Sequence, residues 1–400
     1  MARPQLEMEP MLVDPLAELK RARKVGWLAD LQMGAVGVLT HDRVRELLTD
    51  ARLHSGFVQF MERMGVTSGP FYEWMAISPL NRDGADHLRW RQLMSRSFTP
   101  RSVERLRPFL RDMAHELIDG FADRGACDFV AEFADAYPSL GLCELIGVPP
   151  EDRDRFRDWA NVIGYGFSPV SMAEHIHEID DALVQLLDYT GALAARRRAE
   201  PRDDLVTRIA KAADEDGGYS DFEVRGFIAG LVFAGHETTK NQLGWMVALL
   251  SQRRDVWDGV AAGTFTAEEI VEEVMRIRSA ATNVGRTVTE PIEVHGERLE
   301  PGTQILMSLW SANHDEAAFP KPEEIAPRQN DAPHVGFGYG PHHCIGAALA
   351  RAELQDALTA LTARLECPTI GEGAVWKPPL GINGPERLPI TFARRAGGSR

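Results

Sequence analysis

Cys344 is the residue whose surroundings point most clearly to chemistry. It stands in the segment Phe337-Gly-Tyr-Gly340-Pro-His-His-Cys344-Ile-Gly346. The glycines and proline before the cysteine predict a tight loop, and a helix is predicted from Gly346 to about Leu365. Free N–H groups and partial positive charge at a helix N-terminus stabilise a thiolate over a thiol, and backbone N–H groups tune a metal bound to it. A lone cysteine in a glycine-rich turn would instead indicate a buried core residue.

The other three cysteines, at positions 127, 143 and 367, have ordinary neighbours and no CxxC spacing. We expect them to be small core residues in a protein from a reducing compartment. Cys344 is therefore the one cysteine for which we predict a chemical role.

A long helix is predicted to carry the second chemical motif. Ser220-Asp-Phe-Glu223 forms a capping box, and the apolar segment after it runs to about Leu250. The motif Ala234-Gly235-His236-Glu237-Thr238 lies inside this helix. Ala234 and Gly235 leave room for a flat ligand, whereas an acid beside an alcohol in apolar surroundings is costly unless it is paired or used. Taken alone, the pair is equally compatible with a solvated bend of the helix.

Helical patterning dominates the rest of the chain. Thr266-Ala-Glu-Glu269 predicts the start of a helix that ends near Arg278, and Thr99-Pro100 predicts another helix start. Strand signals are short, at 34–39, 292–294 and 303–307. These patterns predict a mainly helical α+β protein with a small strand-containing lobe.

The pattern Phe-x-x-Gly-x-His-x-Cys-x-Gly resembles the haem-binding loop of the cytochrome P450 family, and the resemblance extends from about Asp14 to Phe392. It implies a P450-like helical fold in a single domain, 1–400, with an ordered core of roughly 14–393. In this fold, haem b lies between the long helix and the cysteine loop. By resemblance, Cys344 is the axial ligand of the iron, while Thr238 hydrogen-bonds dioxygen and Glu237 relays protons as the catalytic pair.

Further haem contacts follow from the same resemblance. His87 and Arg91 lie four residues apart, on one face of a predicted helix, and Arg286 and His342 complete a set of cations for the two haem carboxylates. His342 stands where some family members have arginine. The other expected contacts are Ala234, Phe337, Gly340 and Gly346.

One pair is expected to be structural rather than catalytic. Glu273-Val-Met-Arg276 places an acid and a base at i, i+3 on a helix, a spacing that is common on solvated faces. It resembles the Glu-x-x-Arg element of the family, which pairs with an arginine in the segment before the cysteine loop. Arg328 is the expected partner.

The substrate pocket is expected to be apolar. By resemblance, the segment before His87 covers the distal side of the haem, together with residues of the long helix and of two later turns. For each aromatic residue taken singly, ordinary core packing is the commoner arrangement. The residues expected to line the pocket are Phe71, Trp74, Phe227, Gly230, Leu231, Phe233, Thr282, Val284 and Ile382.

Composition narrows the partners and the location. The formal net charge is −15, which argues against binding to nucleic acid or to an anionic membrane surface. The N-terminal residues lack a secretory signal, and His236, Glu237 and Lys240 interrupt the most apolar long segment. We therefore expect a cytoplasmic protein that has no membrane or nucleic-acid partner.

The resemblance implies a monooxygenase that uses dioxygen to hydroxylate or otherwise oxidise an apolar small organic substrate. Because the sequence contains no flavin or iron–sulfur motif, electrons are expected from separate proteins, and the resemblance implies a ferredoxin and its reductase, fed by NAD(P)H. One alternative is a peroxide-driven or isomerising haem-thiolate enzyme, which the presence of both Glu237 and Thr238 disfavours. Another class, a haem-based sensor or electron carrier, is disfavoured because no signalling or DNA-binding segment is visible.

Overall fold

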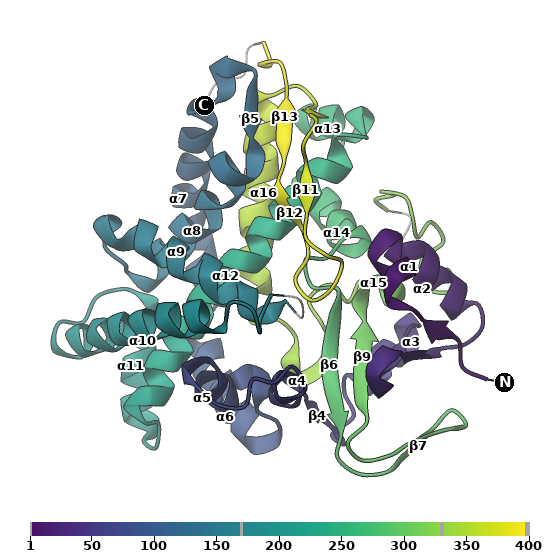
Figure 1. Cartoon of the computed structure of the whole chain (residues 1–400). Helices are drawn as coiled ribbons and strands as arrows, with labels where there is room; N and C mark the ends of the chain where they lie inside the picture. Colours follow the sequence, from purple (N-terminus) through teal and green to yellow (C-terminus); the bar gives the residue numbers. More distant parts are fainter. Residues whose placement is uncertain (1, 169–170, 329–331, 397–400) are drawn as a thin grey trace.

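Helices make up most of the structure (Figure 1). It is a computed structural model that describes residues 2–168, 171–328 and 332–396, without the side chains of residues 33, 96 and 97. The helices are α1 (Met8–Val13), α2 (Pro15–Arg23), α3 (His41–Leu47), α4 (Phe57–Arg63), α5 (Pro70–Ile77), α6 (Gly84–Ser97), α7 (Pro100–Asp119), α8 (Ala136–Ile146), α9 (Arg153–Gly164), α10 (Ile176–Ala199), α11 (Leu205–Asp216), α12 (Asp221–Leu250), α13 (Arg254–Ala261), α14 (Ala267–Ile277), α15 (Leu309–Asn313) and α16 (Ala347–Arg364).

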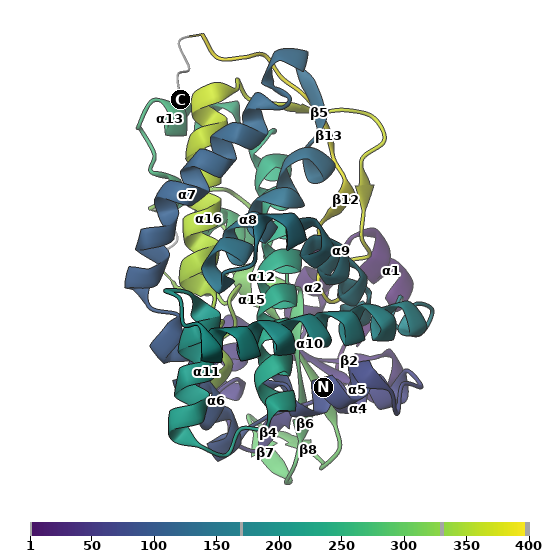
Figure 2. The ribbon, with the colours of Figure 1, turned by 90° about the vertical axis from the view of Figure 1, so that its left-hand side faces the viewer.

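The long helix α12 runs through the middle of the helical part, and α10 crosses it in Figure 2. The capping box that the sequence predicts is present: Ser220 Oγ accepts from the Glu223 N–H, and the Glu223 carboxylate accepts from the Ser220 N–H. Helices α8, α9, α10 and α16 all contact α12. Because neighbours cover it on several sides, polar side chains in its middle need partners inside the protein.

The other helix starts follow the sequence closely. Thr99 caps α7 with Pro100 in the first turn, and Thr266 caps α14 in a second capping box with Glu269. Helix α16 begins at Ala347 with Gly346 as its N-cap, one residue later than predicted. It packs along α7, and its side chains at Leu354, Leu358 and Leu361 are buried. This packing fixes the residue at which the cysteine loop ends.

The largest sheet forms a small lobe beside α1, α2 and α3, whereas two small sheets built from one earlier strand and the C-terminal strands lie beside α16 (Figure 1). The largest sheet has the strand order β1-β2-β3-β9-β6-β4, and β6 and β9 pair antiparallel with Asn283 opposite Ser308. The strands are β1 (Gln5–Leu6), β2 (Leu28–Leu31), β3 (Val36–Val38), β4 (Leu53–Ser55), β5 (Ala126–Asp128), β6 (Asn283–Val288), β7 (Ile292–Val294), β8 (Glu297–Leu299), β9 (Gln304–Ser308), β10 (Thr369–Ile370), β11 (Val375–Trp376), β12 (Pro385–Arg387) and β13 (Pro389–Thr391).

The strand predictions hold in position and differ in extent. Strand β7 has the predicted bounds, and β9 is shifted by one residue. Strand β3 is shorter than the predicted 34–39 because residues 32–34 form a short 3-10 helix, in which Gly34 has a φ of 76°. The strands of the smaller sheets have only two or three residues each, too few for an alternating pattern to be recognised in the sequence.

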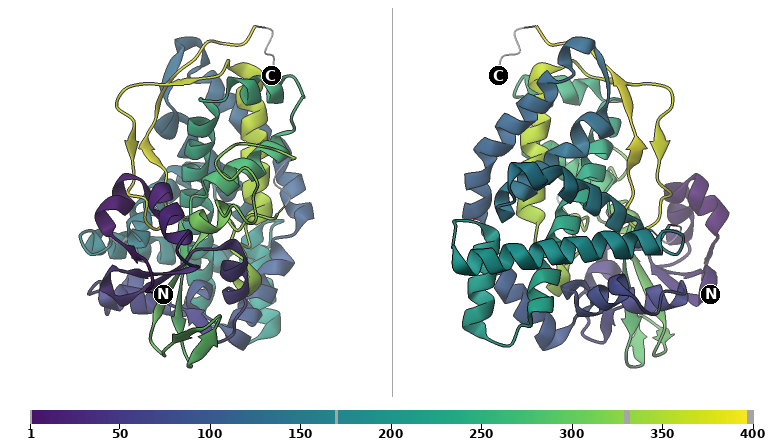
Figure 3. Two further views of the ribbon diagram at one scale, coloured as in Figure 1. Left: turned by 90° about the vertical axis from the view of Figure 1, so that its right-hand side faces the viewer. Right: turned by 60° about the vertical axis from the view of Figure 1, so that its left-hand side comes forward.

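The apolar core is divided between the two parts of the molecule. One large cluster joins the helices, and a second lies between the sheet and α3. Figure 3 shows α1 and α2 close to the large sheet and α7 and α16 in the separate helical part. Cys127, Cys143 and Cys367 are buried, as expected. Among the described residues, no helix is both long and apolar enough to cross a membrane. The structure confirms the predicted mainly helical fold with a small β lobe.

Candidate active site

The cysteine loop is a tight turn that depends on glycine. The N–H of Cys344 donates to the carbonyl oxygen of Phe337 at 2.9 Å, and a short 3-10 helix covers Gly340–His342. Gly338 and Gly340 have φ angles of 71° and 72°. A Cβ on Gly340 would lie 2.9 Å from the carbonyl oxygen of Leu48, so a larger residue would be strained and would also clash.

The Cys344 side chain is accessible although protein atoms surround it closely, so it faces an internal space rather than the outer surface. Burial raises the pKa of the Cys344 thiol, whereas a hydrogen bond from the Gly346 N–H and the charges of Arg91 and Arg351 lower it. A coordinated metal removes the proton from such a thiol outright. Because burial is the largest effect, the raised pKa favours the thiol in the chain alone, and a bound metal would be needed to keep the sulfur as a thiolate.

On α12, the residues Ala234 and Thr238 mark an open turn. Ala234 is exposed although its neighbours Leu231, Val232 and Phe233 are buried. Thr238 lies one turn further along the same face, and its hydroxyl donates to the carbonyl oxygen of Ala234 at 2.7 Å. With only a methyl group at position 234, this face leaves room for a flat group against the helix.

Glu237 points in a different direction from Thr238. Its carboxylate accepts from Asn241 Nδ2 at 2.9 Å, and its carbons lie 3.3–3.4 Å from a Cβ built on Gly164 of α9. Lys240 Nζ lies 2.6 Å from Oε2, and Lys377 Nζ contacts Oε1. Burial alone would raise the pKa of Glu237, but the two lysines bring it down to about 2. The carboxylate is therefore ionised and held by two ammonium groups.

A polar network continues from Lys240 toward the surface. Lys240 Nζ and His236 Nε2 both contact Asn161 Oδ1. His236 Nε2 and Lys240 Nζ also lie 3.3 and 3.7 Å from a carboxylate oxygen of Asp135. Burial opposes ionisation of Asp135, but His236 and Lys240 lower its pKa to about 2. Its side chain is partly exposed, so the network joins α12 to solvent.

The four residues predicted to bind the haem carboxylates differ in whether the described part of the protein satisfies their donors. Arg286 is buried, and its Nη2 has no hydrogen-bond partner among the described residues. The rings of His87 and His342 lie 3.9 Å apart. Burial and the charges of His342 and Arg91 lower the pKa of His87 to about 4. Asp83 accepts from His342 Nε2 at 3.0 Å and is the acid that balances this cluster.

The residues described above have the chemistry needed to hold a haem group. An unsatisfied buried guanidinium beside two histidines suits an anionic group such as a haem carboxylate. Arg91 Nη1 donates to the carbonyl oxygen of His343, which places it at the cysteine loop. The accessible thiol and the open turn at Ala234 supply the axial donor and the space.

The predicted partner of the Glu273–Arg276 pair is wrong. Arg276 Nε donates to Glu273 at 2.8 Å, as expected, but Arg328 pairs with Glu269, one turn earlier on α14. The remaining donors of Arg276 are used by backbone carbonyl groups of Asn313 and of residues 321–324. The N–H of residue 326 donates to Glu273, so backbone groups of the segment before the cysteine loop contact the pair, and Arg328 does not take the predicted position.

The expected pocket residues fall into two groups. Trp74 Nε1 donates to the carbonyl oxygen of residue 226, and its ring lies 3.6 Å from a Cβ built on Gly230. Phe71 and Phe233 both contact the ring of Phe167, at 6.0 and 4.0 Å between centroids. Phe167 was not predicted from the sequence, because it lies on a short 3-10 helix, Tyr165–Phe167, without a motif of its own.

The second group lies outside the aromatic cluster around Phe167. Phe227 packs on Trp90, with 5.2 Å between the ring centroids, and Leu231 is buried. Thr282 hydrogen-bonds to the backbone of residue 381 and lines a small apolar cavity of about 60 Å³ toward the N-terminal segment. Val284 pairs with Met307 in the sheet. Ile382 forms an isolated bridge with residue 281, so the two turns meet as expected.

Comparison with known proteins agrees with this geometry. The family model for cytochrome P450 matches residues 266–381. The luteothin monooxygenase of Streptomyces thioluteus is 34% identical over 377 residues, which are 94% of this chain and 92% of that protein. The mycinamicin IV hydroxylase/epoxidase of Micromonospora griseorubida is 35% identical over 362 residues, 89% of each protein. The solved structure of cytochrome P450 CYP109Q5 from Chondromyces apiculatus has a TM-score of 0.88 and 27% identity, covering 99% of this chain and 100% of that one.

The chain belongs to the cytochrome P450 family. It is a monooxygenase, an oxidoreductase of the bacterial type. The family implies haem as cofactor, the use of dioxygen and a redox partner.

Proposed function

We propose that this monooxygenase oxidises an apolar small organic substrate, most simply by hydroxylation, at a haem ligated by Cys344. The observation that carries the proposal is the joint presence of an accessible thiol before α16, an open turn on α12 and a buried arginine, Arg286, whose Nη2 has no partner within the described part of the chain. Phe337, Gly340 and Gly346 shape the loop around the sulfur. Haem, when bound, supplies the oxidising chemistry, and a thiolate ligand favours cleavage of the O–O bond.

The protein groups divide the remaining work. Arg286, His87, His342 and Arg91 would hold the haem carboxylates, and Ala234 would leave room for the ring. Thr238 would hold and pass a proton on the open face of α12 once its hydroxyl turns away from the Ala234 carbonyl.

Glu237 would receive protons from solvent rather than act alone. The side chains of Lys377 and Asp135 are 22% and 21% exposed, so each gives the buried network a connection to water. Lys240 contacts both acids. For a proton to reach Thr238 from Glu237, the carboxylate must leave at least one lysine, because it now faces α9.

The apolar character of the substrate is supported by the aromatic residues around Phe167 and by relatives. The steroid C26-monooxygenase of Mycolicibacterium smegmatis, 31% identical over 365 residues, is named for an apolar substrate class. A ligand screen for the haem spin-state shift tests this with neutral apolar compounds and matched carboxylates. Tight binding confined to the carboxylates would contradict it.

We further propose a ferredoxin and its NAD(P)H-fed reductase as electron source, supported by the need of the family for a redox partner. Product formed with these proteins and dioxygen supports this route; product formed only with peroxide would contradict it. A cytoplasmic location is supported by the four unpaired cysteines, which suit a reducing compartment.

The Cys344→Ala variant tests the haem ligand. We expect wild-type protein to bind one haem and its reduced carbon monoxide complex to show the red-shifted Soret band of thiolate ligation. The band should be absent from the variant. An unchanged band would eliminate Cys344 as the ligand.

A further inference from the structure

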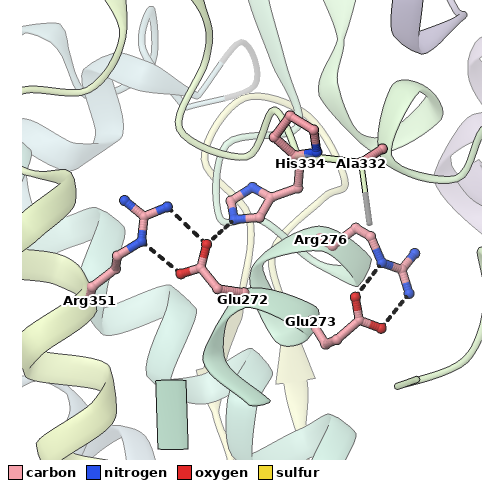
Figure 4. A pocket seen from close by; sticks show the side chains of 7 residues that line it. Glu272, Glu273, Arg276, Ala332, His334 and Arg351 are labelled. Atoms are coloured by element: carbon pink, nitrogen blue, oxygen red, sulfur yellow. Dashed lines mark hydrogen bonds and ion pairs between the residues drawn. The ribbon is translucent and has the colours of Figure 1, made fainter. Parts of the chain in front are cut away.

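Two neighbouring acids on α14 point to different partners. Glu273 pairs with Arg276 and accepts from the N–H of residue 326, before the cysteine loop. Glu272 accepts from Arg351 Nε and Nη2 at 2.7 and 2.9 Å, a two-point contact drawn in Figure 4. Its Oε2 also contacts His334 Nε2 at 3.1 Å. The family motif accounts for Glu273 and leaves Glu272 without a role.

The partners of Glu272 lie on both sides of Cys344. His334 precedes it by ten residues and Arg351 follows it by seven, on α16. His334 Nδ1 accepts from the N–H of Gly336 at 3.0 Å. The Arg351 guanidinium lies over the Phe337 ring, 4.6 Å from its centroid. One carboxylate thus ties the start of the cysteine loop to the helix that follows it.

The ion pair between Glu272 and Arg351 also affects the net charge close to the sulfur of Cys344. Arg351 is one of two cations that act on the Cys344 thiol, the other being Arg91. Burial would raise the pKa of Glu272, but hydrogen bonds from Arg351 and His334 bring it to about 2, so the carboxylate is ionised at neutral pH. Glu272 therefore neutralises a cation next to the thiolate. A cavity of about 140 Å³, lined also by Arg276 and residues 332–333, lies beside this group, and the side chains of Arg351 and Glu272 are 34% and 36% exposed.

We propose that Glu272 is a positioning residue for the cysteine ligand: it holds the loop through His334 and Arg351, and by pairing with Arg351 it sets the net charge facing the thiolate. The inference rests on ligation of iron by Cys344, as proposed above. Positive charge near iron stabilises the reduced state, so charge at this pair adjusts the reduction potential of the haem.

Two variants that break the Glu272–Arg351 pair but change the charge in opposite directions distinguish a charge effect on the haem from simple structural support. Glu272→Gln and Arg351→Gln both break the pair, but the first removes a negative and the second a positive charge. In haem-loaded protein, we expect Glu272→Gln to raise the reduction potential and Arg351→Gln to lower it. The double variant should return toward the wild-type value. Potentials are measured by spectroelectrochemical titration at low ionic strength.

The loop-holding role has its own readout. Both single variants and the double variant should lose the thiolate-type Soret band of the carbon monoxide complex at lower urea concentrations than wild type. Glu272→Asp, which keeps the charge, should restore the potential. Glu269→Gln is the matched control, because Glu269 lies on the same helix and pairs with Arg328 away from Cys344.

Potentials that stay unchanged, or that shift in the same direction in both single variants, would overturn the charge role. Unaltered urea resistance of the band would overturn the loop role. If Glu272→Gln fails to fold, the double variant should still have a higher potential than Arg351→Gln. A wild-type protein without the thiolate-type band would instead refute ligation by Cys344.

Discussion

Replacing Lys377 by Met removes one of the two ammonium groups that hold the Glu237 carboxylate. Lys377 contacts Oε1 and Lys240 contacts Oε2, while the Glu237 side chain is only 4% exposed. The pKa of about 2, against an ordinary 4.5, corresponds to about 3 kcal/mol of stability at neutral pH. With two lysines sharing this effect, we expect Lys377→Met to lower the free energy of unfolding by about 1–2 kcal/mol.

The stability difference between wild type and Lys377→Met should depend on pH in a definite direction. A carboxyl group with a lowered pKa stabilises the folded state above its unfolded pKa of 4.5, and this stability is lost as pH falls toward 2. The difference between wild type and Lys377→Met should therefore be full at pH 7 and shrink below pH 4.5.

Urea unfolding followed by circular dichroism at pH 7 and at several lower pH values measures this difference. Lys211→Met is the control, since Lys211 forms an exposed pair with Glu215 and should change stability by less than about 0.5 kcal/mol. Equal stability of wild type and Lys377→Met at pH 7, or a difference that stays constant down to pH 3, would refute the reasoning.

Three further predictions address other residues. Thr238→Ala should keep haem and substrate binding but lower product formed per reductant consumed several-fold, because proton delivery is disturbed; unaltered coupling would assign that role to another group. Arg286→Gln should lose haem to a scavenging apoprotein roughly ten- to a hundredfold faster, as expected for a lost charge-assisted hydrogen bond; an unchanged transfer rate would remove Arg286 from the carboxylate site. His314 is buried, and burial lowers its pKa from 6.5 to about 3, so stability should be full above pH 6.5 and fall by about 2 kcal/mol at pH 5. The His314→Asn variant should lack this part of the loss in urea unfolding, and an identical pH profile would contradict the assignment.

Local signals in the sequence decided where the main helices begin. The capping boxes at Ser220 and Thr266 and the proline at position 100 act within one turn, so they form in the structure as the sequence predicts. The cysteine loop belongs to the same class, because the positive φ angles of Gly338 and Gly340 are a property of those residues themselves. The family follows from this loop and from the helix that carries Thr238.

Partners across the chain were decided only by the tertiary structure. Lys240 lies three residues from Glu237 on the same helix, whereas Lys377 lies 140 residues away, so no local pattern connects it with Glu237. Arg328 was assigned to the wrong acid because Glu269 and Glu273 are one helical turn apart, and only the path of the chain selects between them. Pairing between side chains that are far apart in the sequence depends on how whole elements pack, because a charged side chain can pair with any opposite charge that packing brings close to it. Sequence spacing therefore determined which residues can take part in chemistry, and packing determined which groups each of them contacts.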